Sequence, residues 1–418
     1  MSFTAFPLHH QLQANLQACG YTVPTPIQEA AIGPVLDGRD LLGLAQTGTG
    51  KTAAFVLPIL QRLLERTGKP TPGPRALIIS PTRELAEQTN DYINKLAART
   101  GLRSAVFYGG VGKAGQIARI RSGIDSVVAC PGRLLDLVQE GALTLTNIRT
   151  LVLDEADHMF DRGFLPDIRR IIKLLPKQRQ NLVFSATMPA EIRALVEAIL
   201  SAPVTVQIDH TKAIATISHV FMRVAQQDKV ALLRDVLNNE GVRSAIVFTR
   251  TKHKAKNLAR QLETSGLRAT SLQGNLSQQK RQQALNGFKD GSYTILVATD
   301  IASRGIDVSE ISHIINFDMP ETAETYTHRT GRTGRAQHNG EAISFIAEDN
   351  GHLAARLERS LGAHLSYRHH SYETATTKPA GPAEQTPRQA KRPQKSAPRQ
   401  RGKSASRRSR AASFDFGI

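Results

Sequence analysis

Residues 40–64 read DLLGLAQTGTGKTAAFVLPILQRLL, and this stretch decides the fold. A short apolar run at 40–45 leads into a glycine-rich turn, after which apolar residues recur with helical spacing. In the turn, Gly48 and Gly50 allow backbone amides to point at phosphate oxygens. Lys51 is placed to reach the β- and γ-phosphates of a nucleotide, and the Thr52 hydroxyl is a ligand for Mg²⁺. The stretch therefore predicts a strand, a phosphate-binding loop and a helix.

One position of this loop departs from the strict pattern, because Ala45 stands where a glycine is usual. The alternative interpretation is a plain glycine-rich turn before an amphipathic helix. The order of strand, loop, Lys-Thr pair and helix favours the phosphate loop. The other loop positions that we expect to contact the nucleotide are Ala45, Gln46, Thr47 and Thr49.

Short apolar runs alternate with helical segments along most of the chain. In the first half, further runs lie at 75–80, 103–108, 126–130, 150–154 and 181–185. The pattern restarts with runs at 219–225, 244–248, 269–273, 294–299, 313–317 and 342–347. Continuous apolar strands that alternate with helices are typical of parallel sheets covered on both faces. The sequence predicts an α/β fold with two such domains of comparable size in tandem.

The domain boundaries follow from changes in this pattern. Residues 203–218 form the longest stretch without helical spacing, so we expect a first domain over 1–208, a linker over 209–217 and a second domain over 218–365. Residues 366–418 are poor in large apolar side chains and rich in Pro, Ser, Gln, Lys and Arg. This composition predicts a disordered basic tail.

The charge of the chain indicates a polyanionic partner, nucleic acid before membrane. The 418 residues include 54 Lys and Arg against 36 Asp and Glu, a net charge of +18, and residues 372–418 hold 11 of the basic residues and 3 of the acidic ones. No apolar run approaches the roughly 18–20 residues of a transmembrane helix. The start, MSFTAFPLHH, has neither the basic nor the apolar segment of a secretory signal.

Cysteine and histidine usage argues against metal and disulfide frameworks. Cys19 and Cys130 lie far apart, and no Cys/His cluster has the spacing of a zinc site. A reducing cytoplasm fits this composition.

An acidic element, TLVLDEAD at 150–157, complements the phosphate loop. Its apolar run ends at Asp154, which places that carboxylate at the carboxyl edge of the sheet, where ligands bind in open α/β folds. We expect Asp154 to hold Mg²⁺ and Glu155 to act as general base on the attacking water. The alternative is an acidic turn that caps the next helix.

With the letters D-E-A-D at 154–157, the chain resembles the DEAD-box RNA helicases of superfamily 2 over about residues 3–350, with the motifs in family order. The resemblance implies two RecA-like domains, ATP and Mg²⁺ as cofactors, and RNA as partner. Phe3 and residues 20–28 resemble the Q motif, in which Gln28 reads the adenine edge and an aromatic residue stacks nearby. Phe3 and Tyr21 are the aromatic candidates.

The resemblance also implies that residues of both halves of the chain form an RNA-binding surface. Its first-half candidates are Pro81, Thr82, Arg83, Gly109, Gly110, Pro131, Gly132 and Arg133. Its second-half candidates are Arg250, Gln273, Gly274, Thr299 and Arg304. The residues implied to couple hydrolysis to strand separation are Asp157, Ser185, Ala186, Thr187 and His328. Aromatic residues make up only 5% of the chain, which agrees with a grip on phosphates and 2′-hydroxyls and little sequence specificity.

The segment HRTGRTGR at 328–335 resembles the sixth family motif. Arg332 and Arg335 are three positions apart, so they share a helical face and suit the stabilisation of charge on a γ-phosphate. Asp307 is implied to lie near the ATP ribose. Since these residues belong to the second half, only a closed arrangement of the two domains would complete the ATP site.

The implied activity is an RNA-stimulated ATPase that locally unwinds RNA duplexes or remodels RNA–protein complexes. The short spacers are most like those of the bacterial RhlE-type group, and the tail is a candidate contact for ribosomal particles or RNA-decay proteins. Two alternatives stay open, namely an ATP-gated RNA clamp or scaffold with little unwinding, and a superfamily 2 DNA helicase.

Two positions depart from the family pattern. Cys130 stands where Thr is usual, and a thiol is the poorer partner for a helix cap or an RNA contact. We expect a buried, inert thiol there rather than an oxidation-sensitive one. Thr330 replaces an aliphatic residue of similar shape within the sixth motif.

Overall fold

The computed structural model describes residues 2–46, 48–65, 73–208, 217–238, 241–303, 311–334 and 340–372. Residues 1–378 belong to one compact unit, and residues 379–418 lie outside the described ranges. Most of the expected linker, and the expected tail from residue 373 on, also lie outside them. Within the described ranges no helix has both the length and the apolar character needed to cross a bilayer.

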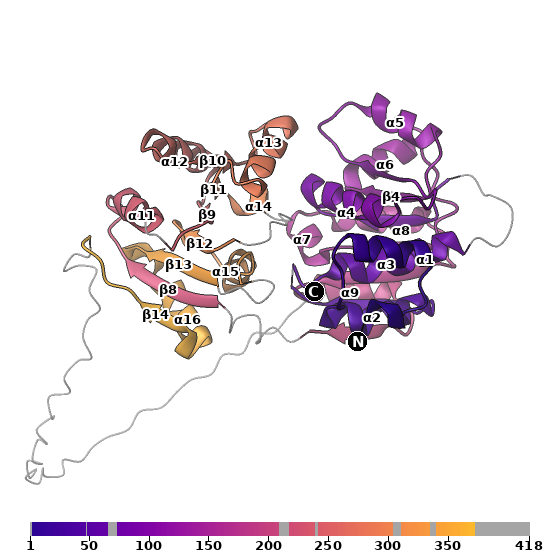
Figure 1. Cartoon of the computed structure of the whole chain (residues 1–418), viewed down its shortest axis with the longest axis horizontal. Coiled ribbons are helices and arrows are strands. Elements are labelled where there is room, and N and C mark those ends of the chain that lie inside the picture. Colours follow the sequence, from indigo (N-terminus) through magenta and orange to yellow (C-terminus); the bar gives the residue numbers. More distant parts are fainter. Residues whose placement is uncertain are drawn as a thin grey trace, which may run out of the picture. The chain divides into compact units, whose positions relative to one another are not determined.

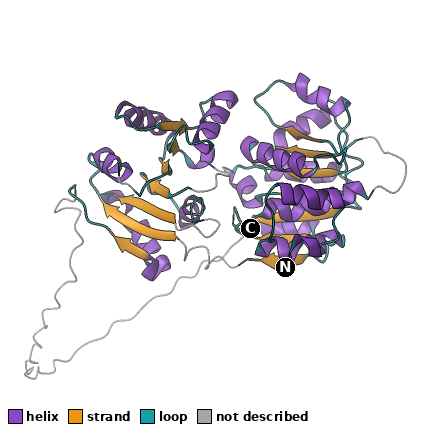
Figure 2. Cartoon of the chain, viewed as in Figure 1, coloured by secondary structure: helices purple, strands orange, loops and turns teal. Residues whose placement is uncertain are grey.

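The first domain is built on seven parallel strands. They are β1 Leu41–Leu44, β2 Ala76–Ile79, β3 Ser104–Phe107, β4 Ser126–Ala129, β5 Thr150–Leu153, β6 Gln180–Ser185 and β7 Val204–Gln207. Their order across the sheet is β3-β4-β2-β5-β6-β1-β7, with parallel pairing throughout. The six strands expected from apolar runs are confirmed, because each run is a buried strand in the interior or at one edge of this sheet (Figures 1 and 2).

Helices cover both faces of this sheet. They are η1 Phe3–Ala5, α1 His10–Ala18, α2 Pro26–Leu36, α3 Lys51–Leu64, α4 Arg83–Leu96, α5 Lys113–Arg121, α6 Pro131–Gln139, α7 Ala156–Asp161, α8 Leu165–Leu174 and α9 Ala190–Ile199. Alternation along β2 sends Ala76 and Ile78 into the core shared with α1–α4, and Leu77 and Ile79 into the core shared with α6–α9. The central strands β2, β4 and β5 are therefore buried on both sides, which explains their apolar sequences.

The second domain repeats this sheet. Its strands are β8 Ile217–Arg223, β9 Ala245–Phe248, β10 Ala269–Leu272, β11 Ile295–Ala298, β12 His313–Asn316, β13 Gly340–Ile346 and β14 Leu365–Tyr367. Their order is β10-β11-β9-β12-β13-β8-β14, again parallel throughout. Counted from the first strand of each domain, the two orders are identical. The expected tandem of RecA-like domains is therefore confirmed.

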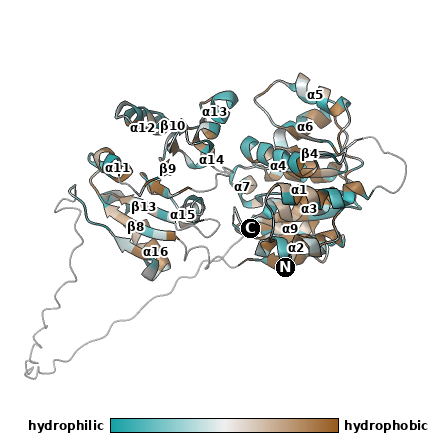
Figure 3. Ribbon diagram, in the orientation of Figure 1, coloured by the Kyte–Doolittle hydropathy of each residue, from teal (hydrophilic) through white to brown (hydrophobic). Residues whose placement is uncertain are grey.

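Helices also cover the second sheet. They are α11 Lys229–Leu237, α12 Lys252–Thr264, α13 Gln278–Lys289, α14 Asp300–Ser303, α15 Ala323–Thr330, η2 Glu348–Asn350, α16 Gly351–Leu361 and η3 Gly362–His364. Apolar residues of α11 and α12 fill one face, whereas α13, α15 and α16 contribute to clusters on the other. Figure 3 shows hydrophilic residues along the ribbons of α12 and α13, whose buried residues are mostly apolar.

Two edge strands lie near the expected boundaries, and one of them crosses its boundary. β7 lies within the first domain expected over 1–208 and pairs with β1. β14 crosses the expected boundary at residue 365 and pairs with β8. Beyond β14, Arg368 N donates to Phe221 O and His370 Nε2 bonds Arg223 O at 2.8 Å. The second domain therefore continues to at least Tyr372.

This boundary can be tested with two shortened chains. A chain that ends at residue 372 should melt at the temperature of the full chain. A chain that ends at residue 364 should melt several degrees lower, because it lacks β14 and leaves the edge of β8 unpaired; roughly 2–4 °C corresponds to 1 kcal/mol in a protein of this size class. Circular dichroism melts measure both, and equal melting of the two shortened chains would contradict the boundary.

Candidate active site and nucleic-acid interface

The phosphate loop joins β1 to α3, and the side chain of Lys51 forms a hydrogen bond within it. Gly50 caps α3 with a φ of +95°, a conformation that disfavours any residue with a Cβ. Lys51 is only 6% exposed, and its Nζ donates to Ala45 O at 2.8 Å. Thr49 Oγ1 donates to Gln46 O at 2.7 Å and tightens the turn. Thr47 lies outside the described residues.

Gln28 holds the loop from the neighbouring helix α2. Its Oε1 accepts from Thr25 N at 2.9 Å, and its Nε2 donates to Gly50 O at 3.1 Å. A Cβ built on Gly50 would overlap this amide, so glycine is required there for a second reason. Gln28 therefore links the helix start to the phosphate loop, a role that its place in the sequence did not predict.

Three aromatic rings pack beside this loop. Tyr21 lies edge-on to Phe3, with ring centroids 6.2 Å apart, and edge-on to Tyr92 at 5.9 Å. Tyr21 and Tyr92 line the cavity next to the loop, whereas Phe3 is buried behind Tyr21. Of the two expected aromatic residues, Tyr21 lines the cavity and Phe3 packs against its ring. The sequence did not single out Tyr92.

One cavity of about 320 Å³ gathers most of the nucleotide candidates that the structure describes. Those that line it are Tyr21, Gln28, Gly48, Gly50, Lys51, Thr52, Asp154 and Glu155. They come from the segment before α2, from α2, from the β1–α3 loop with the start of α3, and from the end of β5. The sheet order places β1 and β5 on either side of β6, so these segments meet at one edge. The side chains expected to hold Mg²⁺, Thr52 and Asp154, lie in this same cavity.

Adjacent buried carboxylates give the cavity its electrostatic character. Burial, followed by the charge of Glu155, raises the pKa of Asp154 to about 7, against the opposing effect of Lys51. Burial also opposes ionisation of Glu155, but His158, Lys51 and Arg332 outweigh it and hold the pKa of that carboxyl well below its ordinary value. Glu155 is thus an ionised base, and Asp154 is a carboxyl that a nearby cation would ionise fully.

His158 orients this base. Its Nδ1 lies 2.7 Å from Glu155 Oε2, and both side chains are almost fully buried. Glu155 has a φ of +54°, one of three positive values at non-glycine positions in the described chain. Such backbone strain concentrates at functional sites. Sequence reasoning missed His158, although its i+3 spacing from Glu155 on α7 was a usable signal.

The last acid of the D-E-A-D group connects to the end of β6. Asp157 Oδ2 accepts from Ala186 N at 3.1 Å, from Thr187 N at 2.8 Å and from Thr187 Oγ1 at 3.1 Å. Asp157 N donates in turn to Ser185 Oγ at 3.2 Å. The structure therefore brings together four of the five residues expected to couple hydrolysis to strand separation. The fifth, His328, lies with its ring 5.0 Å from that of His158.

A separate cavity of about 550 Å³ gathers RNA candidates from both sheets. Those that line it are Pro81, Thr82, Arg83, Gly109, Gly132, Arg133 and Gly274. Gly110 supports this cavity, because its φ of +79° and lack of a Cβ leave room for the Arg83 guanidinium. Arg281 of α13 and Glu84 also line this cavity, and they form an ion pair in which Nε lies 2.7 Å from Oε1.

The structure places other candidates elsewhere. Arg250 lines a different cavity, and Gln273 is buried with its Oε1 bonded to Asn275 N. Arg332 is 3% exposed and acts on the pKa of Glu155. Arg304, Asp307 and Arg335 lie outside the described residues.

The second domain has its own pocket at the position equivalent to the phosphate loop. Lys229 begins α11 as Lys51 begins α3, and the pocket beside it, of about 460 Å³, is also lined by Arg250, Lys254 and Asp318. Lys229 Nζ donates to Phe317 O at 3.0 Å and lies 3.7 Å from Asp318 Oδ1. The loop before Lys229 contains no glycine.

Tandem RecA-like sheets with one phosphate loop, an acidic pair and a basic cavity define a phosphate-loop nucleoside triphosphatase of the helicase type. Comparison with known proteins specifies the family. The family pattern described as DEAD/DEAH box helicase matches residues 25–195, and the helicase conserved C-terminal domain matches residues 228–337. The chain belongs to the DEAD-box ATP-dependent RNA helicases.

Individual relatives agree with this assignment. The ATP-dependent RNA helicase RhlB of Pasteurella multocida is 41% identical over 353 residues, covering 84% of each chain. CshA of Listeria monocytogenes is 41% identical over 345 residues, covering 82% of this chain and 66% of its own length. The structure of Saccharomyces cerevisiae Dbp5 bound to RNA and ADP BeF3 superposes with a TM-score of 0.77 at 29% identity, covering 88% of this chain and 95% of that one.

Cys130 allows a test of local helix chemistry. It caps α6 without any side-chain hydrogen bond, whereas Thr82 and Thr251 cap α4 and α12 by accepting from Leu85 N at 3.1 Å and Lys254 N at 3.2 Å. Cys130→Thr should supply the missing acceptor and raise the free energy of unfolding by about 1 kcal/mol. Urea unfolding measures the change, with Cys130→Ala as the control that should not stabilise.

The same position predicts selective thiol chemistry. Burial, followed by the charge of Glu84, raises the pKa of Cys130 to about 12, so the thiol stays protonated at neutral pH. Cys19 is exposed. Iodoacetamide at pH 8 should alkylate Cys19 at least about tenfold faster than Cys130, as peptide mass spectrometry would show. Equal rates would contradict the inert thiol.

Proposed function

We propose that this protein is an RNA-stimulated ATPase that uses ATP binding and hydrolysis to unwind or remodel short RNA structures locally. The observation that carries the proposal is the single cavity in which Lys51, Asp154 and Glu155 meet beside the phosphate loop. Lys51 supplies positive charge for the β- and γ-phosphates, and ionised Glu155, oriented by His158, accepts a proton from the attacking water. The relatives named above support the same assignment.

Mg²⁺ fits the same cavity. A buried carboxyl and a hydroxyl, those of Asp154 and Thr52, line it, and hard oxygen ligands of this kind suit magnesium. When bound, the ion would neutralise charge on the phosphates. Asp154 would then be fully ionised beside Glu155, because the cation offsets the repulsion between the two carboxylates.

We propose that the 550 Å³ cavity is the binding site for RNA. Arg83 and Arg133 suit phosphate oxygens, and glycines at 109, 132 and 274 let a backbone approach closely. Among the described residues that line it, Phe164 is the one aromatic side chain on which a base could stack. We therefore expect contacts to phosphates and 2′-hydroxyls and little preference for sequence. The Dbp5 structure named as bound to RNA and ADP BeF3 supports this proposal.

The second domain is proposed to complete both sites. Arg332, together with Arg335, Arg304 and Asp307 outside the described residues, would supply its contacts to ATP and RNA. Since both ligands would use both domains, each should favour binding of the other. We further propose a cytoplasmic location, an RhlE-type placement, and contacts of the basic tail with ribosomal particles or RNA-decay proteins.

The decisive substitution is Glu155→Gln. It keeps the shape of the side chain but removes the base, so RNA-stimulated phosphate release should fall by about 10²–10⁴ while ATP and RNA still bind. Glu140→Gln is the matched control, because Glu140 is an exposed carboxylate of the same domain that pairs with Lys113. Near-normal turnover of Glu155→Gln would remove Glu155 from the base role. A strand-displacement assay of the unmodified protein distinguishes unwinding from clamping. Measuring ATPase stimulation by single-stranded DNA in place of RNA tests the DNA-helicase alternative.

The basic tail predicts a salt effect. Deleting residues 373–418 removes 11 basic and 3 acidic residues, so RNA binding should weaken and its dependence on salt should flatten, by about 0.7 in the log–log slope for each phosphate that the tail had neutralised. The KM for ATP should not change. Fluorescence anisotropy between low and moderate salt measures the slope, and an unchanged slope would mean that the tail does not contact RNA.

A further inference from the structure

The loop between β3 and α5, residues 108–112, presents backbone to the proposed RNA cavity. Gly109 of this loop lines the cavity. Gly110 has a φ of +79°, and a Cβ built on it would overlap the guanidinium of Arg83. Three of the five loop residues are glycine, the residue that restricts the backbone least. The position of the loop must therefore be set by groups outside it.

Side chains from three helices hold this loop. Tyr108, its first residue, donates its hydroxyl to Glu87 Oε1 on α4. Gln116 of α5 donates from Nε2 to Tyr108 O at 3.1 Å, and Arg133 of α6 donates from Nη2 to Val111 O at 3.1 Å. The bond to Glu87 connects the loop to α4, the helix whose first turn lines the same cavity.

One face of α4 contacts the loop at two points. Arg83 and Glu87 are four positions apart, so they lie on neighbouring turns of the same face. The Arg83 guanidinium lies against Gly110, and the Glu87 carboxylate bonds Tyr108. Residues 81–83, which lead into α4, line the RNA cavity as the loop does. The bond between Glu87 and Tyr108 therefore fixes the spacing between two segments of the cavity wall.

The Tyr108 hydroxyl remains a donor at neutral pH. The side chain is half-buried and packs against the core shared with α1–α4. Burial, followed by the hydrogen bond to Glu87, raises the pKa of Tyr108 well above its ordinary value, against the opposing charges of Arg119 and Arg83. A bond from this neutral hydroxyl to a carboxylate is charge-assisted, and such bonds are stronger than those between neutral groups.

Glu87 is an acid one helical turn from Arg83, a residue of the RNA cavity. RNA phosphates repel a carboxylate, so the charge of Glu87 alone would weaken RNA binding. Its geometric effect has the opposite sign, because the carboxylate is the acceptor that holds Tyr108 and the loop. The direction in which RNA affinity changes on removal of Glu87 therefore distinguishes the two effects.

We infer that Tyr108 and Glu87 are a pair of positioning residues, which hold the backbone of residues 109–110 at the spacing from the start of α4 that RNA binding requires. The inference rests on the proposed function. Neither side chain touches RNA in this role. Their bond acts on the affinity for RNA and not on the hydrolysis of ATP.

Three variants separate the hydrogen bond from the charge. Tyr108→Phe removes the donor and keeps the ring, and Glu87→Ala removes the acceptor. Glu87→Gln removes the charge but keeps an oxygen that can accept from the tyrosine. The matched control is Tyr367→Phe, which removes the same kind of bond between Tyr367 of β14 and Glu358 of α16. Circular dichroism melts select the folded variants, and either Tyr108→Phe or Glu87→Ala alone suffices for the test.

The expected result is a loss of RNA affinity with an intact ATPase. Fluorescence anisotropy with a labelled single-stranded oligouridine measures the affinity. Its Kd should rise at least about fivefold in Tyr108→Phe and in Glu87→Ala, because loss of a charge-assisted hydrogen bond changes an equilibrium constant by about tenfold or more. Glu87→Gln should bind RNA at least as tightly as the original protein, and Tyr367→Phe should stay within about twofold of it.

Two further measurements separate positioning from a general loss of structure. The RNA concentration that half-saturates the ATPase should rise in step with Kd, while kcat at saturating RNA and the KM for ATP stay within about twofold of the original values. The double variant Tyr108→Phe/Glu87→Ala should bind RNA no more weakly than the weaker single variant, because both changes remove the same bond.

Other outcomes overturn the inference. If Glu87→Ala binds RNA as tightly as the original protein or more tightly, the carboxylate acts through its charge alone. Equal losses in Glu87→Gln and Glu87→Ala, or a fall in kcat that matches the loss of affinity, would also contradict a positioning role. Failure of the proposed function looks different, because the unmodified protein itself would then show no RNA-stimulated ATPase.

Discussion

Parallel strands that end at a common edge are the constraint on which the rest of this structure depends. In the first domain, Ala45 follows β1, Asp154 follows β5 and Ser185 ends β6, so residues far apart in the chain meet at neighbouring strand ends. The RNA candidates follow β2 and β4 at the same edge, where Pro81 lies in the loop after β2 and Pro131 begins α6. The distance between the two cavities is thus set by the spacing of strands in the sheet rather than by the loops themselves.

The chemistry at this edge depends on placing charges where water is excluded. Lys51, Asp154, Glu155 and His158 are all buried, and none would be stable there alone. The lysine ammonium bonds the loop carbonyl of Ala45, and the histidine bonds the glutamate. The acid with the raised pKa, Asp154, also lines the cavity that contains the lysine. Burial and the charge of Glu155 thus disfavour ionisation of Asp154, and a cation in the cavity would favour the ionised carboxylate.

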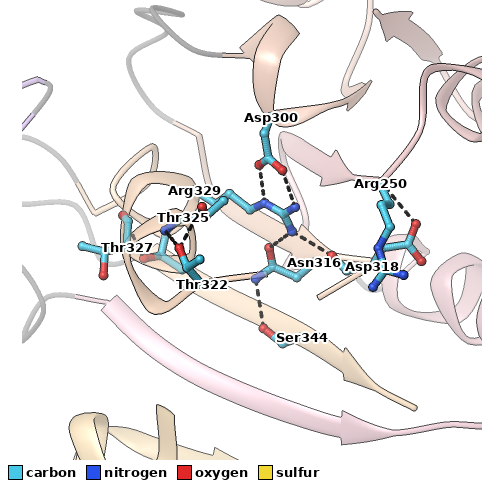
Figure 4. Close-up of polar contacts among 10 residues, drawn as sticks. Arg250, Asp300, Asn316, Asp318, Thr322, Thr325, Thr327, Arg329 and Ser344 are labelled. Carbon is cyan, nitrogen blue, oxygen red and sulfur yellow. Dashed lines mark hydrogen bonds and ion pairs between the residues drawn. The ribbon is translucent and has the colours of Figure 1, made fainter. Parts of the chain in front are cut away.

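Sequence patterns predicted the central strands and the phosphate loop because burial on both faces leaves a continuous apolar run that is hard to miss. They did not predict β7 and β14, since these edge strands have mostly half-buried or exposed side chains and β14 has only three residues. The sequence HRTGRTGR at 328–335 likewise does not show which partners each of its arginines contacts. Arg329 and Arg332 are both buried. Only the folded structure shows that the Arg329 guanidinium bonds Asp300 and Asn316 (Figure 4). The role of Gln28 as a tie to Gly50 was hidden for the same reason, because the hydrogen bond joins two segments that the chain keeps apart.

The repeated sheet order has a consequence for the second domain. Where the first domain keeps Lys51 facing an open cavity, the second places Asp318 beside Lys229, with Lys254 on the same carboxylate at 2.7 Å. The Asp318 carboxylate thus lies beside Lys229 in the second domain, where a nucleotide phosphate would lie beside Lys51 in the first. In the first domain the phosphates of a bound nucleotide would supply the counter-charge for Lys51, whereas in the second domain Asp318 supplies it for Lys229. The repeated architecture in this way combines one domain that responds to ligand with one that holds the Arg250 loop in a fixed place, because Asp318 Oδ2 also accepts from Arg250 N at 3.0 Å.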